Sequence, residues 1–327
     1  MKILVTGASG FIGSYMVERA VQLGYDTWAA IRPTSSRRYL RDERIHLVEL
    51  DFTDENTLSN QLRECPWWDV IIHCAGATKC RNRREYYAVN DEATRHFADV
   101  LIALGKVPLQ FIFMSTLGTY GPQHETPPYR PISDADIPCP NTHYGISKRM
   151  AEVYLMGLRG FPYIIFRPTG VYGPRDRDYR ILINSIRHHL DFSLGSLRQE
   201  VSFVYVRDLV KAVFLAINHG VVRRSYFVTD GNVYTPHDFS HIVQQALGDP
   251  FVIHLNIPLW IGRLVALICD GMEHLLKCNL TLNSDKYRIL SQRNWTCDIT
   301  PLIRELGYAP EYDLRRGVAE TLRKGDV

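Results

Sequence analysis

Several features that mark particular protein classes are missing from this chain of 327 residues. No two cysteines are spaced as C-x-x-C and their number is odd, so the sequence predicts neither a zinc site nor a disulfide framework. We therefore expect no bound metal, and a reducing, cytoplasmic environment suits free thiols. The seven cysteines are Cys65, Cys74, Cys80, Cys139, Cys269, Cys278 and Cys297.

A long apolar run and a clustered basic face are also missing. The most apolar late stretch, 257–268, is too short to span a bilayer and contains Arg263, so no integral membrane span is predicted. We expect a buried or amphipathic helix there, with a helix lying on a membrane surface as the alternative. The net charge is only +3 and the basic residues are scattered, which argues against nucleic acid as a partner.

What the chain does contain is a regular alternation of short apolar runs and longer amphipathic segments. Predicted strands cover 3–5, 26–31, 46–50, 70–74, 109–114 and 163–167, and predicted helices cover 11–23, 86–104 and 144–158. Strands that alternate with helices predict a doubly wound parallel α/β sheet of the Rossmann type. Two later apolar runs, 203–206 and 226–229, are expected to return to this sheet.

The alternation breaks after Pro174, and a chain of this length usually forms more than one lobe. We predict a dinucleotide-binding domain over 1–173, to which 201–232 returns. A smaller substrate-binding lobe is predicted over 174–200 and 233–327.

A glycine-rich turn stands between the first predicted strand and the first predicted helix. Residues 6–13 read TGASGFIG, which places Gly7, Gly10 and Gly13 three residues apart. Glycine allows a tight turn and lets backbone N–H groups approach a pyrophosphate, and the following helix N-terminus favours the anion through its dipole. In this strand–turn–helix context the pattern predicts a dinucleotide site.

The end of the second predicted strand lacks the acidic residue that binds the adenosine ribose in NAD enzymes. Arg32 follows the strand directly, and a guanidinium there can hold a 2′-phosphate and stack on adenine. We therefore expect NADP in preference to NAD. Asp51 follows the third strand, where a carboxylate is equally consistent with a contact to the adenine amino group and with a simple turn cap.

Tyr144 and Lys148 are four residues apart in a predicted helix and therefore share one of its faces. A phenol has a pKa of about 10 in water, and a neighbouring ammonium brings it closer to working pH, so the pair suits proton transfer at a carbonyl or alcohol. Ser115 and Thr116 lie at the carboxyl end of the fifth strand, where open α/β sheets place ligands. A hydroxyl there can bind the substrate oxygen or simply cap the strand end.

Together these pieces resemble an extended short-chain dehydrogenase/reductase of the NAD-dependent epimerase/dehydratase family. The resemblance covers most of the chain, in the family's order. The matching segments are TGASGFIG (6–13), LDFTD (50–54), HCAGAT (73–78), AVNDEAT (88–94), MSTLGTYG (114–121), YGISKRMAE (144–152), RPTGVYGP (167–174) and FVYVRDLVKA (203–212).

The resemblance implies a role for each matched residue. Tyr144 would be the acid/base, and Lys148 would bind the nicotinamide ribose and lower the pKa of Tyr144. Thr116 would hold the substrate oxygen, with Ser115 as the adjacent alternative. Asn90 would be structural and hold a water of the proton relay. The implied cofactor-binding residues are Gly7, Ser9, Gly10, Phe11, Ile12, Gly13, Arg32, Asp51, Phe52, Cys74, Ala75, Gly76, Tyr144, Lys148, Pro168 and Thr169.

The sequence also departs from some branches of this family. Leu117 and Gly118 stand where its dehydratases carry acidic residues, so sugar dehydration is not expected. The segment RPTGVYGP and the apolar stretch 257–268 are more similar to the branch of dihydroflavonol reductase and 3β-hydroxysteroid dehydrogenase. The resemblance further implies a homodimer formed through two helices of the Rossmann domain, with the helix of Tyr144 as one candidate.

Three functions stay open at this point. The leading one is an NAD(P)-dependent oxidoreductase that transfers hydride between nicotinamide and a ketone or secondary alcohol of a small-molecule substrate. The second is a nucleotide-sugar epimerase with tightly bound NAD. Its candidate phosphate ligands are Arg175, Arg177, Arg180 and Arg187. The third is a non-catalytic NADP-sensing protein, against which the intact acid/base set argues.

Overall fold

The computed structural model describes residues 1–80, 82–195, 198–276 and 283–324, so Cys278 lies outside the described part. The chain folds into two compact units. The first comprises Met1–Thr116, His143–Arg167 and Val210–Tyr226, and the second comprises Leu117–Thr142, Pro168–Leu209 and Phe227–Val327. The predicted division placed all of 1–173 in the dinucleotide-binding domain, whereas the structure groups 117–142 with the second unit.

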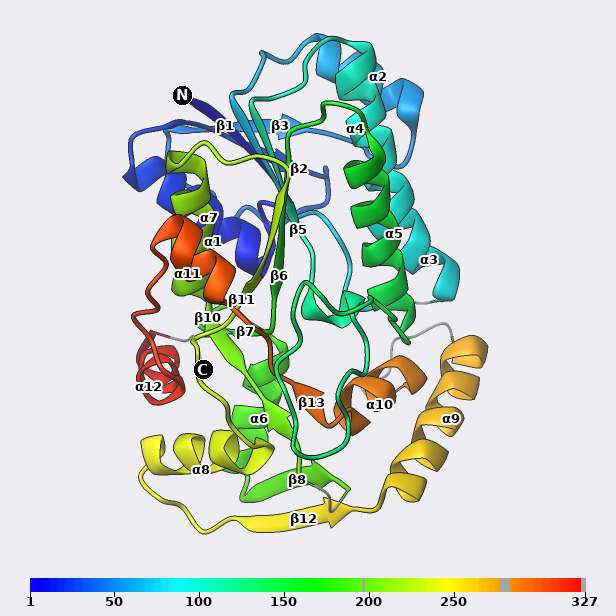
Figure 1. Cartoon of the computed structure of the whole chain (residues 1–327), viewed down its shortest axis with the longest axis vertical. Helices are drawn as coiled ribbons and strands as arrows, with labels where there is room; N and C mark the ends of the chain where they lie inside the picture. The colour runs from blue at the N-terminus through cyan, green and yellow to red at the C-terminus, as the bar shows by residue number, and fades with distance from the viewer. Residues whose placement is uncertain (81, 196–197, 277–282, 325–327) are drawn as a thin grey trace. The chain divides into compact units, whose positions relative to one another are not determined.

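A seven-stranded sheet forms the middle of the first unit, in the order β11-β6-β5-β4-β1-β2-β3 (Figure 1). Its strands are β1 (Lys2–Thr6), β2 (Asp26–Ile31), β3 (Ile45–Glu49), β4 (Val70–His73), β5 (Gln110–Met114), β6 (Tyr163–Pro168) and β11 (Arg224–Val228). Neighbouring strands from β3 across to β6 are all parallel. The predicted doubly wound α/β sheet is confirmed, and the apolar run at 226–229 joins it within β11.

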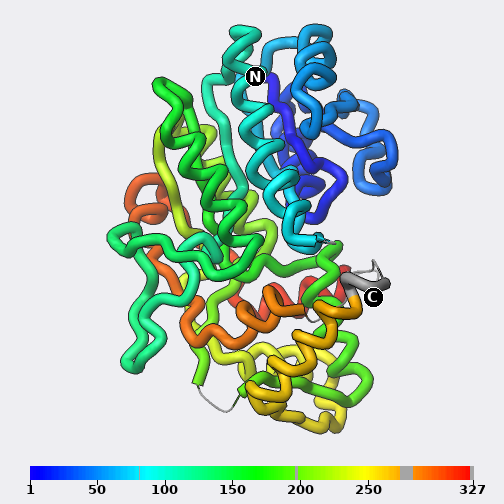
Figure 2. The backbone as a smooth tube through the Cα atoms, turned by 90° about the vertical axis from the view of Figure 1, so that its right-hand side faces the viewer, coloured from blue at the N-terminus to red at the C-terminus, as the bar shows by residue number. Residues whose placement is uncertain are grey.

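Helices cover both faces of this sheet. α2 (Glu55–Arg63), α4 (Ala93–Ala103) and α5 (His143–Gly157) lie on one face, and α1 (Phe11–Gln22) and α7 (Val206–Asn218) lie on the other (Figure 1). Figure 2 shows α4 and α5 side by side, and the Tyr154 hydroxyl of α5 donates to the Asp99 carboxylate of α4. Because both faces are covered, the central strands are apolar almost throughout instead of alternating with polar residues.

The side of the sheet covered by α2, α4 and α5 holds a large apolar core. Phe97 of α4 and Leu155 of α5 pack into one cluster with Phe111 and Ile165 of the strands, and all four side chains are fully buried. Burial of a side chain of this size contributes about 2 kcal/mol to folding. This core holds α5 against the end of β5, where the predicted acid/base residues lie.

The helix predicted over 86–104 is interrupted. It begins as α3 (Arg83–Tyr87), passes through a π-helical turn, η1 (Ala88–Glu92), and continues as α4. Asn90 lies within this turn and its side chain is fully buried. Such turns are frequent at functional sites. Hydrophobic periodicity does not reveal them, because one inserted residue barely changes the pattern over so short a window.

The described residues of the second unit contain small parallel strand pairs and several helices. The strands are β7 (Gly170–Tyr172), β8 (Leu190–Leu194), β9 (Glu200–Val201), β10 (Phe203–Tyr205), β12 (Ile253–Ile257) and β13 (Asn294–Trp295), paired as β10–β7, β12–β8 and β13–β9. The helices are η2 (Leu117–Thr119), α6 (Asp178–Arg187), α8 (Pro236–Ala246), α9 (Leu259–Leu276), α10 (Ser284–Ser291), α11 (Thr300–Leu306) and α12 (Leu314–Lys324).

The expectation that 203–206 returns to the central sheet is wrong. β10 pairs instead with β7, and Phe203 lies opposite Gly170. The reason is aromatic packing within the second unit. The Phe203 ring lies 5.5 to 5.8 Å from the rings of Tyr179 and Phe239, centroid to centroid. The place beside β6 in the central sheet is taken by β11.

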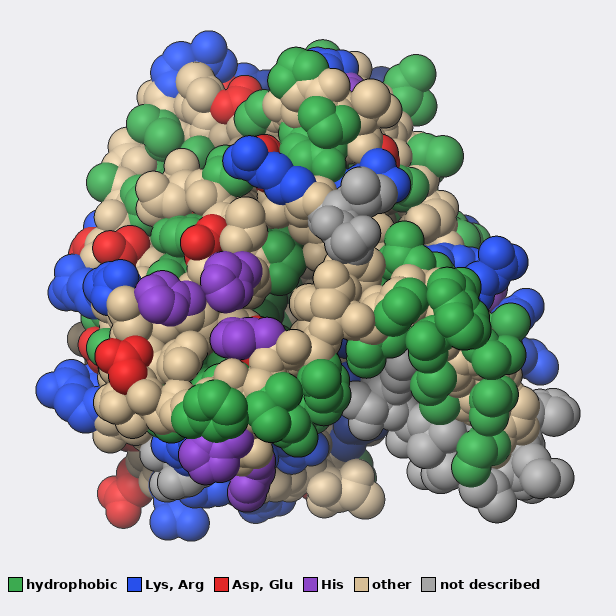
Figure 3. Space-filling view, turned by 90° about the horizontal axis from the view of Figure 1, so that it is seen from below, with side chains coloured by type: hydrophobic (Ala, Val, Ile, Leu, Met, Phe, Trp, Pro, Cys, Tyr) green, Lys and Arg blue, Asp and Glu red, His purple; other side chains and the backbone are tan. Residues whose placement is uncertain are grey.

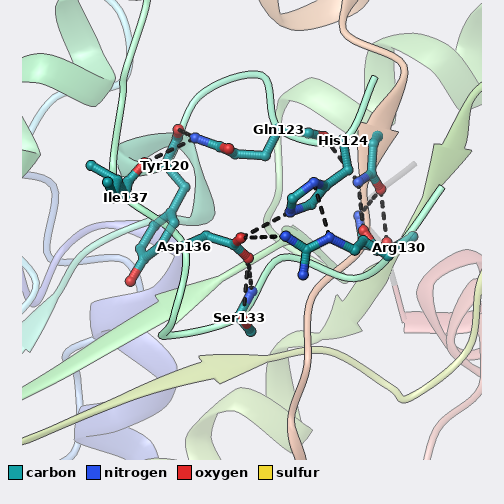
Figure 4. Close-up of polar contacts among 9 residues, drawn as sticks. Tyr120, Gln123, His124, Arg130, Ser133, Asp136 and Ile137 are labelled. Carbon is teal, nitrogen blue, oxygen red and sulfur yellow. Dashed lines mark hydrogen bonds and ion pairs between the residues drawn. The ribbon is translucent and has the colours of Figure 1, made fainter. Parts of the chain in front are cut away.

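The long segment that precedes α5 has little regular structure and is held by polar side chains (Figure 4). The Asp136 carboxylate accepts from the Ser133 N–H and hydroxyl and contacts His124 and Arg130. Burial opposes ionisation of Asp136, but the hydrogen bonds from Ser133 and His124 outweigh it and lower its pKa. Asn294 donates to the Arg130 carbonyl at 2.9 Å, and both residues belong to the second unit.

The apolar stretch near 257–268 forms the first part of α9. Ala266 is buried, but the side chains of Trp260, Leu264 and Leu267 are more than half exposed. The helix therefore carries an exposed apolar surface, whereas the sequence favoured a buried or amphipathic helix. Within the described ranges, no helix is both long and apolar enough to cross a membrane.

Candidate active site

The glycine-rich turn joins β1 to α1. Gly7 has a φ of +63°, which favours glycine, and the Gly10 N–H donates to the Gly7 carbonyl at 2.9 Å. A Cβ at Gly13 would lie 2.2 Å from that same oxygen, so α1 can start this close to the turn only with glycine there. Gly10 is the N-cap and offers no side-chain acceptor, so the first N–H groups and the dipole of α1 suit a pyrophosphate. The other predicted residues of this turn are Ser9, Phe11 and Ile12.

The loop after β4 lies directly against this turn. A Cβ at Gly7 would come within 2.7 Å of the Cys74 carbonyl group, so the two backbones are in contact. The Thr6 hydroxyl accepts from the Ala75 N–H at 3.1 Å and joins the loop to the end of β1. Cys74, Ala75 and Gly76 therefore lie at the same edge of the sheet as the glycine turn, where a doubly wound sheet binds its ligand.

His73, at the end of β4, is a buried residue that sequence reasoning missed. Its Nδ1 lies 2.9 Å from the Thr6 hydroxyl and its Nε2 lies 3.2 Å from the Thr94 hydroxyl. Thr94 gives its own proton to the Asn90 carbonyl, so we assign His73 as a neutral imidazole that donates from Nε2 and accepts at Nδ1. Burial, helped by the charge of Lys148, lowers the pKa of His73 to about 3.

Asn90 connects the loop after β4 to α5. Its Oδ1 accepts from the Ala77 N–H at 2.8 Å, and its Nδ2 donates to the Ala77 carbonyl at 3.0 Å and to the Ser147 hydroxyl at 3.1 Å. Ser147 in turn donates to the Tyr144 carbonyl at 2.9 Å. The side chain of Asn90 thus positions the first turn of α5.

The two candidate hydroxyls at the end of β5 have different partners. The Thr116 hydroxyl hydrogen-bonds the Tyr144 phenol. The Ser115 hydroxyl is buried and donates to the Glu152 carboxylate, two turns further along α5. The structure therefore places Thr116, and not Ser115, beside the predicted acid/base. Successive residues at a strand end point to opposite sides, and the sequence alone did not show which side faces Tyr144, so it could not decide between Ser115 and Thr116.

Lys148 lies between these two contacts on α5. Only 3% of its surface is exposed. Its ammonium donates to the Met114 carbonyl at 2.9 Å and lies 4.6 Å from the centre of the Phe113 ring, a cation–π contact. A Cβ at Gly76 would lie 2.9 Å from the Lys148 Nζ, so the ammonium also reaches the loop after β4. This places a positive charge beside the predicted nicotinamide side of the site.

Burial moves both groups of the pair towards their neutral forms. It raises the pKa of Tyr144 to about 12, and the hydrogen bond with Thr116 offsets only part of that rise. It lowers the pKa of Lys148 to about 8, against the opposing effects of Cys74 and Glu152. Burial is thus the main influence on the Tyr144 pKa here, and the lowering by Lys148 that the resemblance implies stays a prediction.

Beneath the pair lies a buried ion pair that sequence reasoning also missed. The Arg167 guanidinium, near the end of β6, contacts the Glu152 carboxylate through two hydrogen bonds of 3.0 Å each. Both side chains are buried. The available signal was the spacing of Glu152, which lies four residues after Lys148 and therefore on the same face of α5.

The predicted adenosine end of the site lies past β2 and β3. Arg32 is exposed, and its N–H donates to the Ser35 hydroxyl at 3.0 Å in a tight turn. The Asp51 carboxylate accepts from the Thr53 N–H at 2.9 Å and from its hydroxyl at 2.6 Å, as a turn cap does. The Phe52 ring packs on the core of the first unit.

Pro168 and Thr169 belong to the second unit. Pro168 is the last residue of β6, and the Thr169 N–H donates to the Val228 carbonyl at the end of β11, at 3.1 Å. Their predicted contact with the cofactor stays a prediction.

The family model of NAD dependent epimerase/dehydratase enzymes matches residues 3–228, from β1 through the glycine turn and α5 to β11. The chain belongs to this family. It is therefore an enzyme of the NAD(P)-dependent dehydrogenase, reductase and epimerase type, and its cofactor is a nicotinamide dinucleotide.

Relatives of this epimerase/dehydratase family member differ in the activities they are named for. A decarboxylating sterol-4-alpha-carboxylate 3-dehydrogenase of Dictyostelium discoideum is 24% identical over 97% of this chain and 99% of its own length. An uncharacterized UDP-glucose epimerase of Bacillus subtilis is 31% identical over 65% of this chain and 71% of its own. The crystal structure of a Bacillus anthracis dTDP-glucose 4,6-dehydratase in complex with NAD shares the fold, with a TM-score of 0.78 at 17% identity over 99% of this chain and 96% of that one.

We predict that the His73→Gln variant loses less free energy of unfolding than the wild type when the pH is lowered. The folded pKa of about 3 lies below the ordinary 6.5, so between these values the unfolded chain holds a proton that the folded chain does not. Stability therefore falls as the pH drops through this window, by about 2 kcal/mol for His73 between about pH 6.5 and 5. Urea unfolding at several pH values measures this, and His73→Gln should lose that much less than the wild type.

The exposed His219 provides the control, because His219→Gln should keep the wild-type pH dependence. If His73→Gln shows the same pH dependence as the wild type, His73 is not the neutral buried imidazole inferred above.

Proposed function

We propose that this protein is an NADP(H)-dependent reductase or dehydrogenase that interconverts a ketone and a secondary alcohol, with Tyr144 as the acid/base. The observation that supports it best is the hydrogen bond between Tyr144 and Thr116 at the carboxyl end of β5, with Lys148 one turn further along α5. Because the two hydroxyl groups lie within hydrogen-bonding distance of each other, both can hydrogen-bond the same substrate oxygen.

In the direction of reduction, Tyr144 donates a proton to the carbonyl oxygen. Its pKa of about 12 keeps the phenol protonated at neutral pH, which suits donation. The Thr116 hydroxyl holds the same oxygen in place. In the reverse direction the phenol must first ionise, and nearby positive charge, including the Lys148 ammonium, favours that. The bound nicotinamide supplies or accepts the hydride.

The residues at the carboxyl edge of the sheet fit a dinucleotide. In this proposal the N–H groups of the glycine turn and α1 bind the pyrophosphate, and the loop 74–76 lines the nicotinamide half. Lys148 binds the nicotinamide ribose. We infer a preference for NADP because Arg32 presents an exposed guanidinium directly after β2, where NAD enzymes carry an acid.

We further propose a substrate with an apolar carbon skeleton. The relative from Dictyostelium discoideum named as a sterol dehydrogenase aligns over nearly its whole length. Leu117 and Gly118 replace the acidic residues expected of a sugar dehydratase. The second unit, to which the sequence assigns substrate binding, carries an exposed apolar surface on α9.

A nucleotide-sugar epimerase is the second candidate. The Bacillus subtilis relative is named as a UDP-glucose epimerase, and several arginines gather at α6. Arg177 and Arg180 are exposed at its first turn, and Arg175 just before it has a positive φ of 76°. Guanidinium groups suit a diphosphate. In that case the hydride would return to the same substrate and the cofactor would stay bound.

Replacement of Tyr144 with Phe tests the catalytic proposal. We expect kcat for NADPH-dependent reduction of ketosteroids or long-chain ketones to fall by about 10²- to 10⁴-fold, because the phenol no longer supplies a proton. NADPH affinity, followed by fluorescence titration, should stay within about twofold, and Tyr25→Phe, just before β2, is the control. If Tyr144→Phe keeps full activity and cofactor binding, the protein is not an enzyme of this mechanism, and the NADP-sensing alternative gains.

Titration with both dinucleotides tests the cofactor preference. We expect exchangeable NADPH to bind more tightly than NADH, and Arg32→Ala to weaken NADPH by about 10- to 100-fold while NADH changes little, because only NADPH carries the phosphate that pairs with the guanidinium. Arg19→Ala, an exposed arginine on α1, is the control. The nucleotide released on denaturation is identified in the same experiment. Stoichiometric, non-exchanging NAD would make the epimerase the leading function.

We also propose a cytoplasmic homodimer that forms through α4 and α5. Met150, Val153 and Met156 follow one another at three-residue spacing on α5 and are 38 to 53% exposed. Ile102 of α4 is 44% exposed. A repeated apolar exposure of this kind is typical of a surface that a partner covers. The free cysteines of the described part suit a reducing compartment.

Val153→Glu should convert this dimer to a monomer, because the interface would have to bury an unpaired carboxylate. Light scattering after size-exclusion chromatography measures the mass. The control is Leu109→Glu, the same kind of change at a residue 62% exposed elsewhere in the first unit, which should leave the dimer intact. A wild-type protein that is monomeric at micromolar concentration would exclude the interface.

A further inference from the structure

We propose that the second unit binds a divalent transition-metal ion of the Zn²⁺ class through Asp191, His237 and His254. One ligand atom from each of these side chains lies within 4.8 Å of the other two. The three residues come from β8, α8 and β12, which are separate in sequence and meet at one surface. None of them belongs to the active site described above.

The register of the small sheet brings two of the ligands together. β12 pairs in parallel with β8, and His254 lies opposite Asp191. Residues opposite each other on neighbouring strands point to the same side, and the His254 Nδ1 lies 2.9 Å from the Asp191 Oδ2. A random distribution of exposed polar residues would not be expected to pair a carboxylate with an imidazole across two neighbouring strands.

The third ligand comes from the first turn of α8. Thr235 caps this helix through a capping box with Asp238, which fixes where the helix begins and therefore where His237 lies. The His237 ring lies 5.6 Å from the His254 ring, centroid to centroid. Figure 3 shows histidine side chains gathered on the face that it views.

The donor set selects the metal. Imidazole nitrogen together with one carboxylate oxygen suits Zn²⁺ and its neighbours, whereas Mg²⁺ and Ca²⁺ prefer oxygen ligands alone. In this proposal the exposed side chains of His237 and His254 rotate when the ion binds, because Zn²⁺–nitrogen bonds are about 2 Å long and the ligand atoms lie up to 4.8 Å apart without it. The Ser240 hydroxyl donates to the Asp191 Oδ1 at 2.8 Å and holds the carboxylate in place, the usual task of an outer-shell residue.

A metal held in this way would join three elements of the second unit. Without it, α8, β8 and β12 are connected by packing and by the hydrogen bonds of Asp191 to Ser240 and His254. Because the ion binds the folded protein, binding must raise the unfolding temperature. The open coordination positions go to water, which agrees with the exposure of both histidines.

The test uses the full-length protein, free of any histidine tag and treated with a chelator, titrated with Zn²⁺ by calorimetry. We expect about one ion per chain, a higher unfolding temperature with Zn²⁺, and reversal by the chelator. His237→Ala and His254→Ala should each weaken Zn²⁺ binding by at least about tenfold. His219→Ala, which removes an exposed histidine of the first unit, should bind Zn²⁺ like the wild type.

Co²⁺ in place of Zn²⁺ separates this site from the cysteines. Binding through nitrogen and oxygen gives d–d absorption without thiolate-to-metal charge-transfer bands. The proposal is overturned by the absence of saturable binding, by binding that survives in both histidine variants, or by charge-transfer bands that assign the ion to thiols. Circular dichroism of the metal-free variants shows whether they fold, and both replaced side chains are exposed.

Discussion

The contact on which the rest of the active site depends joins two stretches of backbone, the glycine turn after β1 and the loop after β4. β1 and β4 are parallel neighbours, so both chains leave the sheet at the same edge. They are so close there that any side chain at Gly7 would meet the Cys74 carbonyl group. The atoms that a Cβ at Gly7 would meet belong to the backbone and cannot rotate away as a side chain could, so this position requires glycine. The hydrogen bond from Ala75 to Thr6 and the buried imidazole of His73 complete the same join.

A second constraint comes from one stripe of α5. Tyr144, Lys148 and Glu152 follow at four-residue spacing and therefore share a face of the helix. Each meets a neighbouring atom at the end of β5: Tyr144 meets the Thr116 hydroxyl, Lys148 meets the Met114 carbonyl, and Glu152 meets the Ser115 hydroxyl. The helix and the strand end are thus locked in register, and Arg167 fixes Glu152 from the next strand. A shift of α5 by one residue would break every one of these contacts.

The sequence predicted the parts of the structure that local pattern controls. The apolar runs, the glycine turn and the four-residue spacing of Tyr144 and Lys148 each depend on a few neighbouring residues, and the central sheet agrees with them. It did not predict the partner of β10, because that strand is placed by aromatic contacts with residues such as Phe239 that are distant in sequence. It missed His73 for the same reason, since a lone histidine at the end of an apolar strand carries no local signal. Roles of individual site residues come from the resemblance and stay predictions.

The electrostatics of the site explain why such a costly arrangement is useful. A buried Lys148 held by a backbone carbonyl and an aromatic ring is poorly compensated, which its lowered pKa of about 8 records. A phenol with a pKa of about 12 is likewise held in its neutral form. Two apolar side chains at these positions would make the fold more stable, because they could pack there without the cost of burying a charge. In the proposed complex, hydroxyl groups of a ribose beside Lys148 and a carbonyl oxygen beside Tyr144 would add further partners to the ones that these groups already have. The burial that costs stability therefore makes the pKa values of both groups sensitive to what binds beside them, and the proton transfer proposed above would require that sensitivity.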